Sequence, residues 1–411
     1  MELGSLLKDK HILLGVTGSI AAYKAATLAS HLTQAGALVD VVLTEAGARF
    51  VAPLTFEALT GRPAYTDMWH PPGPTHIAHV GLAEVADLLV IAPVTAHTMA
   101  KLAAGLADNL LTATALAARC PLLLAPAMDG GMWAHPATQA NVNTLRQRGA
   151  HFAGPVRGRM ASGLEGEGRM MEPEELLGHI RLVLGRDGPL AGRRVVVTAG
   201  PTREHLDPVR FLSNPSSGRQ GFALALAALD RGAAVTLITG PVALPTPVGA
   251  KGIVVTTAQE MHDAVLSAVE QADALLMTAA VADYRPAVAA SQKIKKGEGD
   301  LTLRLARTPD ILAAVARQRT ETGFPRVVVG FAAESENLME NARAKLSAKH
   351  LHLIVANDVT APDAGFGVET NRVVLIGRDG SVEELPLMSK AAVAEAVLER
   401  VAGLLAAVEG V

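Results

Sequence analysis

HILLGVTGSIAAYK, residues 11–24, joins an apolar run to an alanine-rich helical pattern through a turn that contains two glycines. Gly15 and Gly18 allow a tight turn, and Ser19 is a candidate cap for the helix that follows. Backbone N–H groups at such a helix start bind anions, typically a phosphate. The stretch therefore predicts a strand, a phosphate-binding turn and a helix, the opening unit of a doubly wound α/β domain.

This turn favours a mononucleotide over a dinucleotide. Its spacing departs from Gly-x-Gly-x-x-Gly, and the next apolar run, VDVVLT, closes on Thr44 instead of an acidic residue that would hold a ribose. A plain strand-to-helix turn without a ligand is the alternative that this motif alone leaves open.

Apolar runs and helical patterns alternate along the whole chain. Buried strands are predicted at HILLGV, VDVVLT, LLVIAP and PLLLAP in the first half, and at RVVVTAG, AVTLITG, ALLMTAA, RVVVGFAA and HLIVAND in the second. Alanine-rich helices, such as 219–231 and 258–271, lie between these runs. Continuous apolar strands between helices indicate parallel sheets covered on both faces. The predicted fold class is α/β, with two doubly wound, mainly parallel-sheet, Rossmann-like domains.

The boundary between the two domains is predicted at GRDGPLAGRR, residues 185–194. This stretch combines glycine, proline and charge and has no hydrophobic periodicity. The predicted domains are 1–185 and 193–411, joined by a linker at 186–192. The halves share no repeated motif, so we expect no internal duplication.

Composition limits the class of protein. Hydrophobic residues make up 49% and charged residues 19% of the chain, and the net charge is −3, so we expect no nucleic-acid partner. The single cysteine, Cys120, permits no intrachain disulfide and favours a reducing compartment. No apolar run reaches the roughly 18–20 residues of a membrane span, and the N-terminus lacks a signal-peptide pattern. We expect a cytoplasmic protein with no membrane contact.

Two histidines precede the LLVIAP run, within THIAHVGLAEVAD. His79 lies eight residues before Asp87, and His76 lies about one helical turn before His79. A histidine near a nucleotide or flavin site could move protons near neutral pH. A solvated or capping histidine is the alternative, and metal binding is disfavoured because no third ligand has suitable spacing.

Four patterns of the first half occur in a characteristic order. They are GSIAAYK (18–24), ADLLVIAPVTAHTMAKLAAGLADNLL (86–111) after the histidine, APAMDGGMW (125–133) and SGLEGEGRM (162–170). In this order they resemble the flavin-dependent cysteine decarboxylases. The resemblance implies a flavodoxin-like domain whose FMN phosphate lies near Gly18, Ser19, Thr44, Pro93 and Thr95. It also implies that FMN carries the redox step of the decarboxylation and that His79 handles the proton, with His76 as the alternative.

Asp129 departs from the family pattern, which has asparagine at this place in Pro-Ala-Met-Asn-x-x-Met-Trp. The resemblance implies that this residue holds the substrate carboxylate, which an ionised aspartate would repel. Either Asp129 is protonated, or a Lys or Arg compensates, or decarboxylation is weakened; simple capping of a helix or turn is a further interpretation. Ser162 is a second departure, because the family often has a proton-donating cysteine there, and a hydroxyl is a far weaker acid than a thiol.

The second half adds TAGPTREHLDPVRFLSNPSSGRQG (198–221), AAVADYRP (279–286), KIKK (293–296), TPDIL (308–312), GFAAE (330–334) and AND (356–358). With the first half, this order resembles the bacterial bifunctional enzymes of coenzyme A biosynthesis, in which phosphopantothenoylcysteine decarboxylase is fused to phosphopantothenate–cysteine ligase. The resemblance implies that CTP, with Mg²⁺, activates 4'-phosphopantothenate as an acyl cytidylate, which the amine of cysteine then attacks. The implied site residues of this half are Asn214 for the intermediate, Lys293 for charge in the second half-reaction, Asp283, Pro309, Asp310, Ile311, Leu312 and Phe331 for the nucleotide, and Lys345 and Lys349 for the triphosphate.

The resemblance also implies a homo-oligomer. Trimers of the first half, with FMN at subunit interfaces, and dimers of the second half would give a dodecamer. Three other functions stay open on the sequence: an active ligase with a weakly active or regulatory flavin domain, a flavoprotein regulatory subunit, and a peptidyl-cysteine decarboxylase. A regulatory subunit would need an acidic tail or an added partner segment, whereas the sequence closes simply on LLAAVEGV. A peptidyl-cysteine decarboxylase would leave the ligase-like half unexplained.

Overall fold

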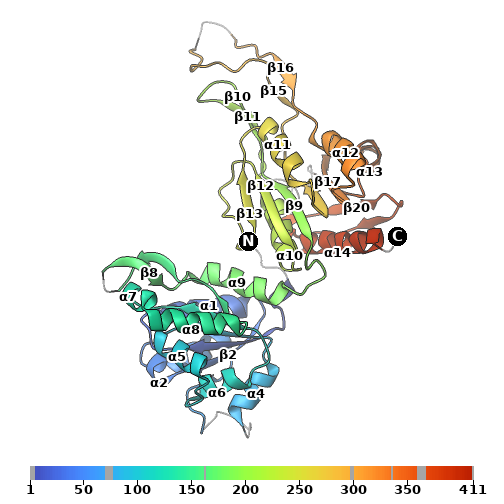
Figure 1. The fold of residues 1–411 in the computed structure, drawn as a ribbon. Helices are drawn as coiled ribbons and strands as arrows, with labels where there is room; N and C mark the ends of the chain where they lie inside the picture. Colours follow the sequence, from blue (N-terminus) through green and yellow to red (C-terminus); the bar gives the residue numbers. More distant parts are fainter. Residues whose placement is uncertain are drawn as a thin grey trace. The chain divides into compact units, whose positions relative to one another are not determined.

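A computed structural model describes residues 5–69, 77–161, 163–296, 300–334, 337–358 and 367–409. The chain forms two compact units, Ser5–Leu184 and Gly185–Val411. Each unit is an α/β structure built on one large sheet (Figure 1), so the predicted fold class is confirmed. Within the described helices, none is both long enough and apolar enough to cross a bilayer.

The sheet of Ser5–Leu184 has six parallel strands in the order β3-β2-β1-β4-β5-β6. These strands are β1 (His11–Val16), β2 (Leu38–Leu43), β3 (Ala64–Tyr65), β4 (Leu88–Val94), β5 (Leu122–Pro126) and β6 (His151–Phe152). Without the two-residue β3, the order is that of flavodoxin-like domains. All seven residues of β4 are buried, as a continuous apolar run in a parallel sheet predicts.

Helices cover both faces of this sheet. They are α1 (Ala22–Gln34), α2 (Glu45–Ala48), α3 (Pro53–Thr60), α4 (Ala78–Val85), α5 (Ala96–Ala104), α6 (Leu110–Ala117), α7 (Gly130–Ala134), α8 (Pro136–Gln147) and α9 (Pro173–Gly185). Helix α1 packs beside α3, whereas α4 packs beside α6 and α5 beside α8. An antiparallel hairpin of β7 (Val156–Arg159) and β8 (Glu165–Arg169) lies outside the sheet and packs against α7.

The first glycine turn differs in detail from the prediction. Gly15 lies inside β1, where a Cβ atom would come within 2.6 Å of the Leu111 side chain, so this glycine admits α6 onto the sheet. Helix α1 starts at Ala22 and has Ala21 as its N-cap. The hydroxyl of Ser19 accepts instead from the Ala21 N–H at 3.3 Å and fixes the turn that precedes the helix.

The sheet of Gly185–Val411 has eight strands in the order β13-β12-β9-β14-β17-β18-β20-β21. They are β9 (Arg194–Ala199), β12 (Ala234–Thr239), β13 (Lys251–Val254), β14 (Ala274–Met277), β17 (Val327–Glu334), β18 (Leu353–Asp358), β20 (Val373–Gly377) and β21 (Val382–Glu384). The first six are parallel, and β20 and β21 add antiparallel pairs at one edge. All nine apolar runs quoted from the sequence thus coincide with strands of the two sheets.

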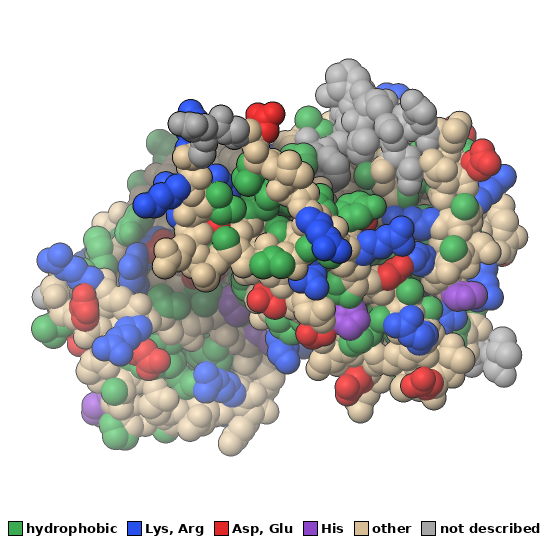
Figure 2. All heavy atoms as spheres, turned by 90° about the horizontal axis from the view of Figure 1, so that it is seen from above, with side chains coloured by type: hydrophobic (Ala, Val, Ile, Leu, Met, Phe, Trp, Pro, Cys, Tyr) green, Lys and Arg blue, Asp and Glu red, His purple; other side chains and the backbone are tan. Residues whose placement is uncertain are grey.

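The helices of this unit are α10 (Arg219–Leu229), α11 (Ala258–Ala268), α12 (Ile311–Thr322), α13 (Leu338–Ala348) and α14 (Lys390–Glu409). Three short antiparallel ladders accompany them: β10 (Arg203–His205) with β11 (Phe211–Ser213), β15 (Tyr284–Pro286) with β16 (Leu305–Arg307), and β19 (Thr370–Asn371) with β22 (Met388–Ser389). Figure 2 shows Lys and Arg side chains in small groups among acidic and hydrophobic side chains on the face that it draws.

Candidate active sites

A pocket of about 1310 Å³ lies at the carboxyl ends of the strands in Ser5–Leu184. Four strands end there: β1 leads to Gly18 and Ser19, β2 to Thr44, β4 to Thr95 and β5 to Asp129, and all five residues line the pocket. Parallel strands bring their carboxyl ends to one edge of the sheet, where ligands of such folds bind. The fold therefore gathers residues that were singled out from four separate motifs.

Helix starts surround this pocket and direct N–H groups at it. Thr44 caps α2 by accepting from the Gly47 N–H at 3.1 Å, and Thr95 caps α5 by accepting from the Thr98 N–H at 3.3 Å. The remaining amides of the first turns, together with the helix dipoles, favour a negatively charged group. This arrangement fits the phosphate of a mononucleotide such as FMN.

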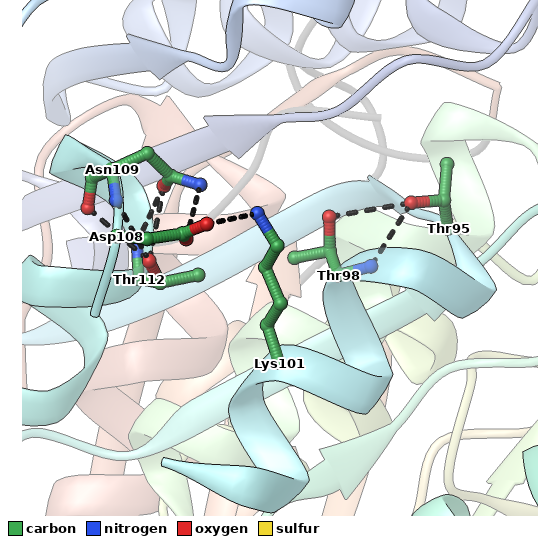
Figure 3. Close-up of polar contacts among 6 residues, drawn as sticks. All are labelled: Thr95, Thr98, Lys101, Asp108, Asn109 and Thr112. Atoms are coloured by element: carbon green, nitrogen blue, oxygen red, sulfur yellow. Dashed lines mark hydrogen bonds and ion pairs between the residues drawn. The ribbon is translucent and has the colours of Figure 1, made fainter. Parts of the chain in front are cut away.

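An ion pair fixes one wall of the pocket (Figure 3). The Lys101 ammonium, on α5, lies 2.6 Å from the Asp108 carboxylate, and its side chain is only 17% exposed. This hydrogen bond from Lys101 lowers the pKa of Asp108. The next residue, Asn109, caps α6 in a reciprocal capping box with Thr112. The sequence motif 86–111 contains these residues, but no role was predicted for them. The Asn-x-x-Thr spacing before an apolar run would have predicted the capping box.

Asp129 lies both at the start of a helix and in the wall of the pocket. It is the N-cap of α7, where its Oδ1 accepts from the Gly131 N–H at 3.0 Å, and it lines the pocket. The preceding amide, of Met128, donates to the Gly168 carbonyl at 2.9 Å. The loop that carries Asp129 is thus attached to strand β8 of the hairpin.

Basic side chains also line this pocket. Lys24 is only 4% exposed, and its Nζ donates to the Met170 carbonyl at 2.8 Å and to the Glu172 carboxylate at 2.9 Å. The hydrogen bond from Lys24 is the main cause that lowers the pKa of Glu172. Arg159 and Arg169 of the hairpin complete a set of cations that suits an anionic ligand.

Two other predicted residues, His79 and Pro93, do not line the pocket of their own chain. His79 is half-buried on α4 and is not among the lining residues. Pro93 is buried within β4, also away from the lining, and its carbonyl accepts from the Thr17 hydroxyl at 2.8 Å. Ser162 and the alternative His76 fall outside the described residues.

A second pocket, of about 700 Å³, lies in Gly185–Val411, again at the carboxyl side of its parallel strands. It gathers nine of the ten residues predicted for this half: Asn214, Asp283, Pro309, Asp310, Ile311, Leu312, Phe331, Lys345 and Lys349. The Asn214 amide donates to the Ala280 carbonyl at 3.1 Å. This hydrogen bond holds Asn214 near the carboxyl end of β14.

Lys349 and Asp310 form an ion pair across this pocket. Asp310 also caps α12, where it accepts from the Ala313 N–H at 3.0 Å. Burial alone would raise the pKa of Asp310, but the hydrogen bonds from Lys349 and Ala313 outweigh it and lower the pKa. Lys345 donates to the Phe331 carbonyl at 3.3 Å. Both lysines thus contact groups in the wall of the pocket.

Lys293 is the predicted residue that does not line this pocket in the described structure. It is exposed in the loop between β15 and β16. The loop is anchored one residue later, because the Ile294 N–H donates to the buried Asp207 carboxylate at 3.1 Å. Burial would raise the pKa of Asp207, but backbone donors from Val209, Ile294 and Arg210 outweigh it and lower the pKa.

Sequence reasoning missed several lining residues of the second pocket: Arg219, Asn357, Asn371 and Lys390. The Asn357 Oδ1 is buried without a hydrogen-bond partner in the described structure, so a ligand donor would satisfy it. Over the described residues, no group of three or more His, Cys, Asp or Glu side chains is arranged to hold a metal ion.

Comparison with known proteins covers nearly the whole chain. The family model "Flavoprotein" matches residues 2–184, and the model "DNA/pantothenate metabolism flavoprotein C-terminal domain" matches residues 190–405. The coenzyme A biosynthesis bifunctional protein CoaBC of Bacillus subtilis is 47% identical over 402 residues, which cover 97% of this chain and 98% of the relative. The protein of the same name from Mycobacterium tuberculosis strain H37Rv is 47% identical over 409 residues, 97% of each chain.

A crystal structure of the C-terminal domain of a coenzyme A biosynthesis bifunctional protein CoaBC aligns with a TM-score of 0.45 and 38% identity, and covers 53% of this chain and 98% of that one. The match to each family model in its own half, and identity to full-length relatives along the whole chain, lead to one conclusion. The chain belongs to the family of bifunctional coenzyme A biosynthesis proteins CoaBC.

Proposed function

We propose that the chain carries out two consecutive steps of coenzyme A biosynthesis. The unit Gly185–Val411 joins cysteine to 4'-phosphopantothenate at the expense of CTP, and the unit Ser5–Leu184 decarboxylates the product to 4'-phosphopantetheine with FMN. The observation that carries the proposal is that each unit has its own pocket at the carboxyl edge of its sheet, lined by residues of its own motifs.

In the first pocket, the N–H groups at the starts of α1 and α5 bind the FMN phosphate, with hydroxyl contacts from Ser19, Thr44 and Thr95. Bound FMN supplies the electron sink and source that decarboxylation of the cysteinyl group requires. Asp129 lies beside the substrate carboxylate, at the N-terminus of α7, where it accepts one N–H. Arg159 and Arg169 on the hairpin balance the negative charge of the substrate.

In the second pocket, Asn214 holds the activated acyl group beside the start of α10, and Phe331 packs near the base. Lys345 and Lys349 would balance the charge of the triphosphate, and Mg²⁺ that arrives with the nucleotide would reduce that charge further. Lys293 approaches from the loop between β15 and β16 and stabilises charge when the amine attacks.

The functional molecule is a homo-oligomer in this proposal. His79 lies outside the pocket of its own chain, while Ile20 and Tyr23, which line that pocket, are 58% and 60% exposed. A neighbouring copy that covers these apolar side chains would bring its own His79 to the flavin. Mixing His79→Asn and Asp129→Ala variants before reassembly tests this arrangement: if each variant alone has lost decarboxylase activity, shared sites restore part of it in the mixture.

A one-pot assay tests the function. Purified protein is supplied with 4'-phosphopantothenate, cysteine, CTP and Mg²⁺, and both pyrophosphate and the thiol products are measured. We expect a yellow protein, release of pyrophosphate and accumulation of 4'-phosphopantetheine. Accumulation of phosphopantothenoylcysteine would indicate an active ligase with an inactive flavin unit, and a colourless protein that releases no pyrophosphate would refute the proposal.

A further inference from the structure

The second pocket contains a buried acceptor atom that the described structure leaves unsatisfied. Asn357 lies in β18, lines the pocket and is half-buried. Its Oδ1 is fully shielded from solvent and accepts no hydrogen bond among the described residues. Buried side-chain carbonyls nearly always have a donor, because an acceptor that has lost its water without a replacement destabilises the fold. No role was predicted for the AND motif that contains this residue, so the Oδ1 atom is a candidate ligand contact.

The neighbouring strands offer Asn357 no side-chain donor. Asn357 pairs with Ala333 of β17 on one side and with Val373 of β20 on the other. Paired residues project from the same face of a sheet, so the amide lies between two apolar side chains. Val355, two residues earlier on the same face, is fully buried. Ala333 is exposed and lines the pocket, and its small side chain leaves the approach from the pocket to the amide open.

Other side chains of the pocket wall direct their donors elsewhere. The Asn371 amide donates to the Gln220 side chain at 3.5 Å. The Lys345 ammonium donates to the Phe331 carbonyl at 3.3 Å. A buried apolar residue would fit the β18 position of Asn357 without leaving an acceptor unsatisfied. An asparagine is therefore better explained by what binds in the pocket than by the packing of the sheet.

We propose that the Oδ1 of Asn357 accepts a hydrogen bond from a ligand bound in the second pocket. The inference rests on the proposed ligase function, which brings two ligands with suitable donors. CTP carries the amino group of cytosine and the hydroxyls of ribose, and 4'-phosphopantothenate carries a hydroxyl and an amide N–H. Ionised phosphate and carboxylate groups only accept hydrogen bonds, so Asn357 contacts an uncharged, donor-bearing part of the ligand.

The test replaces Asn357 by leucine, which has a similar size and no polar atom. Calorimetric titrations of the full chain measure the dissociation constants of CTP with Mg²⁺ and of 4'-phosphopantothenate. We expect one of these ligands to bind about three- to tenfold more weakly, as for the loss of one hydrogen bond between neutral groups. The other ligand keeps its wild-type affinity. The ligand that weakens is the source of the donor.

Analogues of that ligand identify the donor group. For CTP they are UTP, which has a carbonyl in place of the amino group, and 2'-deoxy- and 3'-deoxy-CTP. For 4'-phosphopantothenate they are the compound without the hydroxyl and the ester that replaces the amide. The analogue without the contacting donor binds to Asn357→Leu no more weakly than to the wild type, because the two changes remove the same hydrogen bond. An equal loss for every analogue would overturn the inference, since leucine would then only obstruct the pocket.

Stability separates a ligand contact from a structural role. The urea transition of Gly185–Val411 should not fall in Asn357→Leu, because leucine leaves no buried acceptor unsatisfied. Asn371→Leu is the matched control: Asn371 also lines the pocket and is only 4% exposed, but it donates to Gln220 and accepts from the Arg372 N–H. This control should lower the stability. A similar loss in Asn357→Leu would overturn the inference, because Asn357 would then have a partner in the free protein.

Wild-type affinities of Asn357→Leu for both CTP and 4'-phosphopantothenate would also overturn the inference, and water alone would then satisfy the Oδ1 atom. A wild-type protein that releases no pyrophosphate in the one-pot assay would instead refute the ligase function itself. The two failures are therefore distinguishable.

Discussion

The Met128 amide donates to the Gly168 carbonyl at 2.9 Å, which joins the loop that carries Asp129 to strand β8. Gly168 has a φ of +152°, a backbone conformation that residues other than glycine rarely adopt. A Cβ atom at Gly168 would lie 2.3 Å from the Met128 carbonyl oxygen. Because the obstacle is backbone, the loop and the hairpin would have to separate.

Gly168→Ala is therefore expected to impair the first pocket and spare the second. The strain amounts to roughly 1–3 kcal/mol, and we expect decarboxylase activity and FMN content to fall at least severalfold while pyrophosphate release by the ligase is unchanged. Gly163→Ala is the matched control, since Gly163 also has a positive φ, of +85°, but no atom lies within 4 Å of its Cβ position. Equal losses in both variants would show that the contact with Met128 is not the cause.

Asp129→Asn separates the charge of this residue from its capping role. The Asn side chain keeps the carbonyl oxygen that accepts from the Gly131 N–H, and Asp and Asn are equally good N-caps. We expect unchanged stability and decarboxylase turnover that is equal to or higher than wild type, because the repulsion of the substrate carboxylate is removed. Asp129→Ala, in contrast, loses the cap, at a cost of about 1 kcal/mol. A large loss of turnover in Asp129→Asn would show that the carboxylate itself is used.

The strands and the gathering of motif residues followed from the sequence for a simple reason. Parallel strands buried on both faces are continuous apolar runs, which made the strands predictable. The family resemblance implied one site that contains Thr44, Thr95 and Asp129, and the shared carboxyl edge of the strands explains why these residues lie at one pocket. The prediction for the start of α1 was wrong. Ser19 could either cap the helix or fix the preceding turn, and Gly15 could either form the turn or lie inside β1, and the sequence does not distinguish these alternatives. Gly15 gives room for Leu111, a contact between residues 96 positions apart.

The missed residues depend on pairings that no local pattern reveals. The Lys390 N–H meets the Glu369 carbonyl only because β19 pairs with β22, and Arg219 lies next to Glu369 although the two are 150 positions apart in the sequence. Lys101 and Asp108 are close in sequence, but a Lys and an Asp seven residues apart meet only if the chain turns between α5 and α6. Such contacts can be predicted only when the fold is known, whereas helix caps and strands can be predicted from local sequence patterns.

Lys293→Gln is expected to separate the two half-reactions of the ligase. Lys293 is exposed on its loop and does not line the described pocket, so formation of the acyl cytidylate, measured as pyrophosphate release in a single turnover without cysteine, stays partly intact. Formation of phosphopantothenoylcysteine stalls, because the positive charge that assists attack by the amine is gone. Lys295→Gln, on the same exposed loop, is the control and leaves both steps unchanged. Unaltered turnover of Lys293→Gln would remove Lys293 from the mechanism.

His352 predicts how the stability of Gly185–Val411 depends on pH. Its Nδ1 accepts from the Val328 N–H at 2.9 Å, so protonation at this nitrogen would break a contact between β17 and the residue that precedes β18. Burial, and then the charges of Arg319 and Arg378, lower the pKa of His352 to about 4, whereas the pKa of an unfolded histidine is about 6.5. Between these values the unfolded state binds more protons, so the stabilisation is complete above about pH 6.5 and is lost as the pH falls toward 4.

His352→Asn keeps a hydrogen-bond acceptor and removes the titrating group, so the free energy of unfolding should depend less on pH between about 6.5 and 4. Both tryptophans, Trp69 and Trp133, lie in Ser5–Leu184, and a urea transition seen by circular dichroism but not by tryptophan fluorescence reports the other unit. His350→Asn, at an exposed position two residues earlier, controls for the loss of a histidine. If the pH slope of His352→Asn matched that of the wild type, proton binding at His352 would not be the source of acid sensitivity, and the carboxylates that pair with Arg or Lys in this unit would have to account for it.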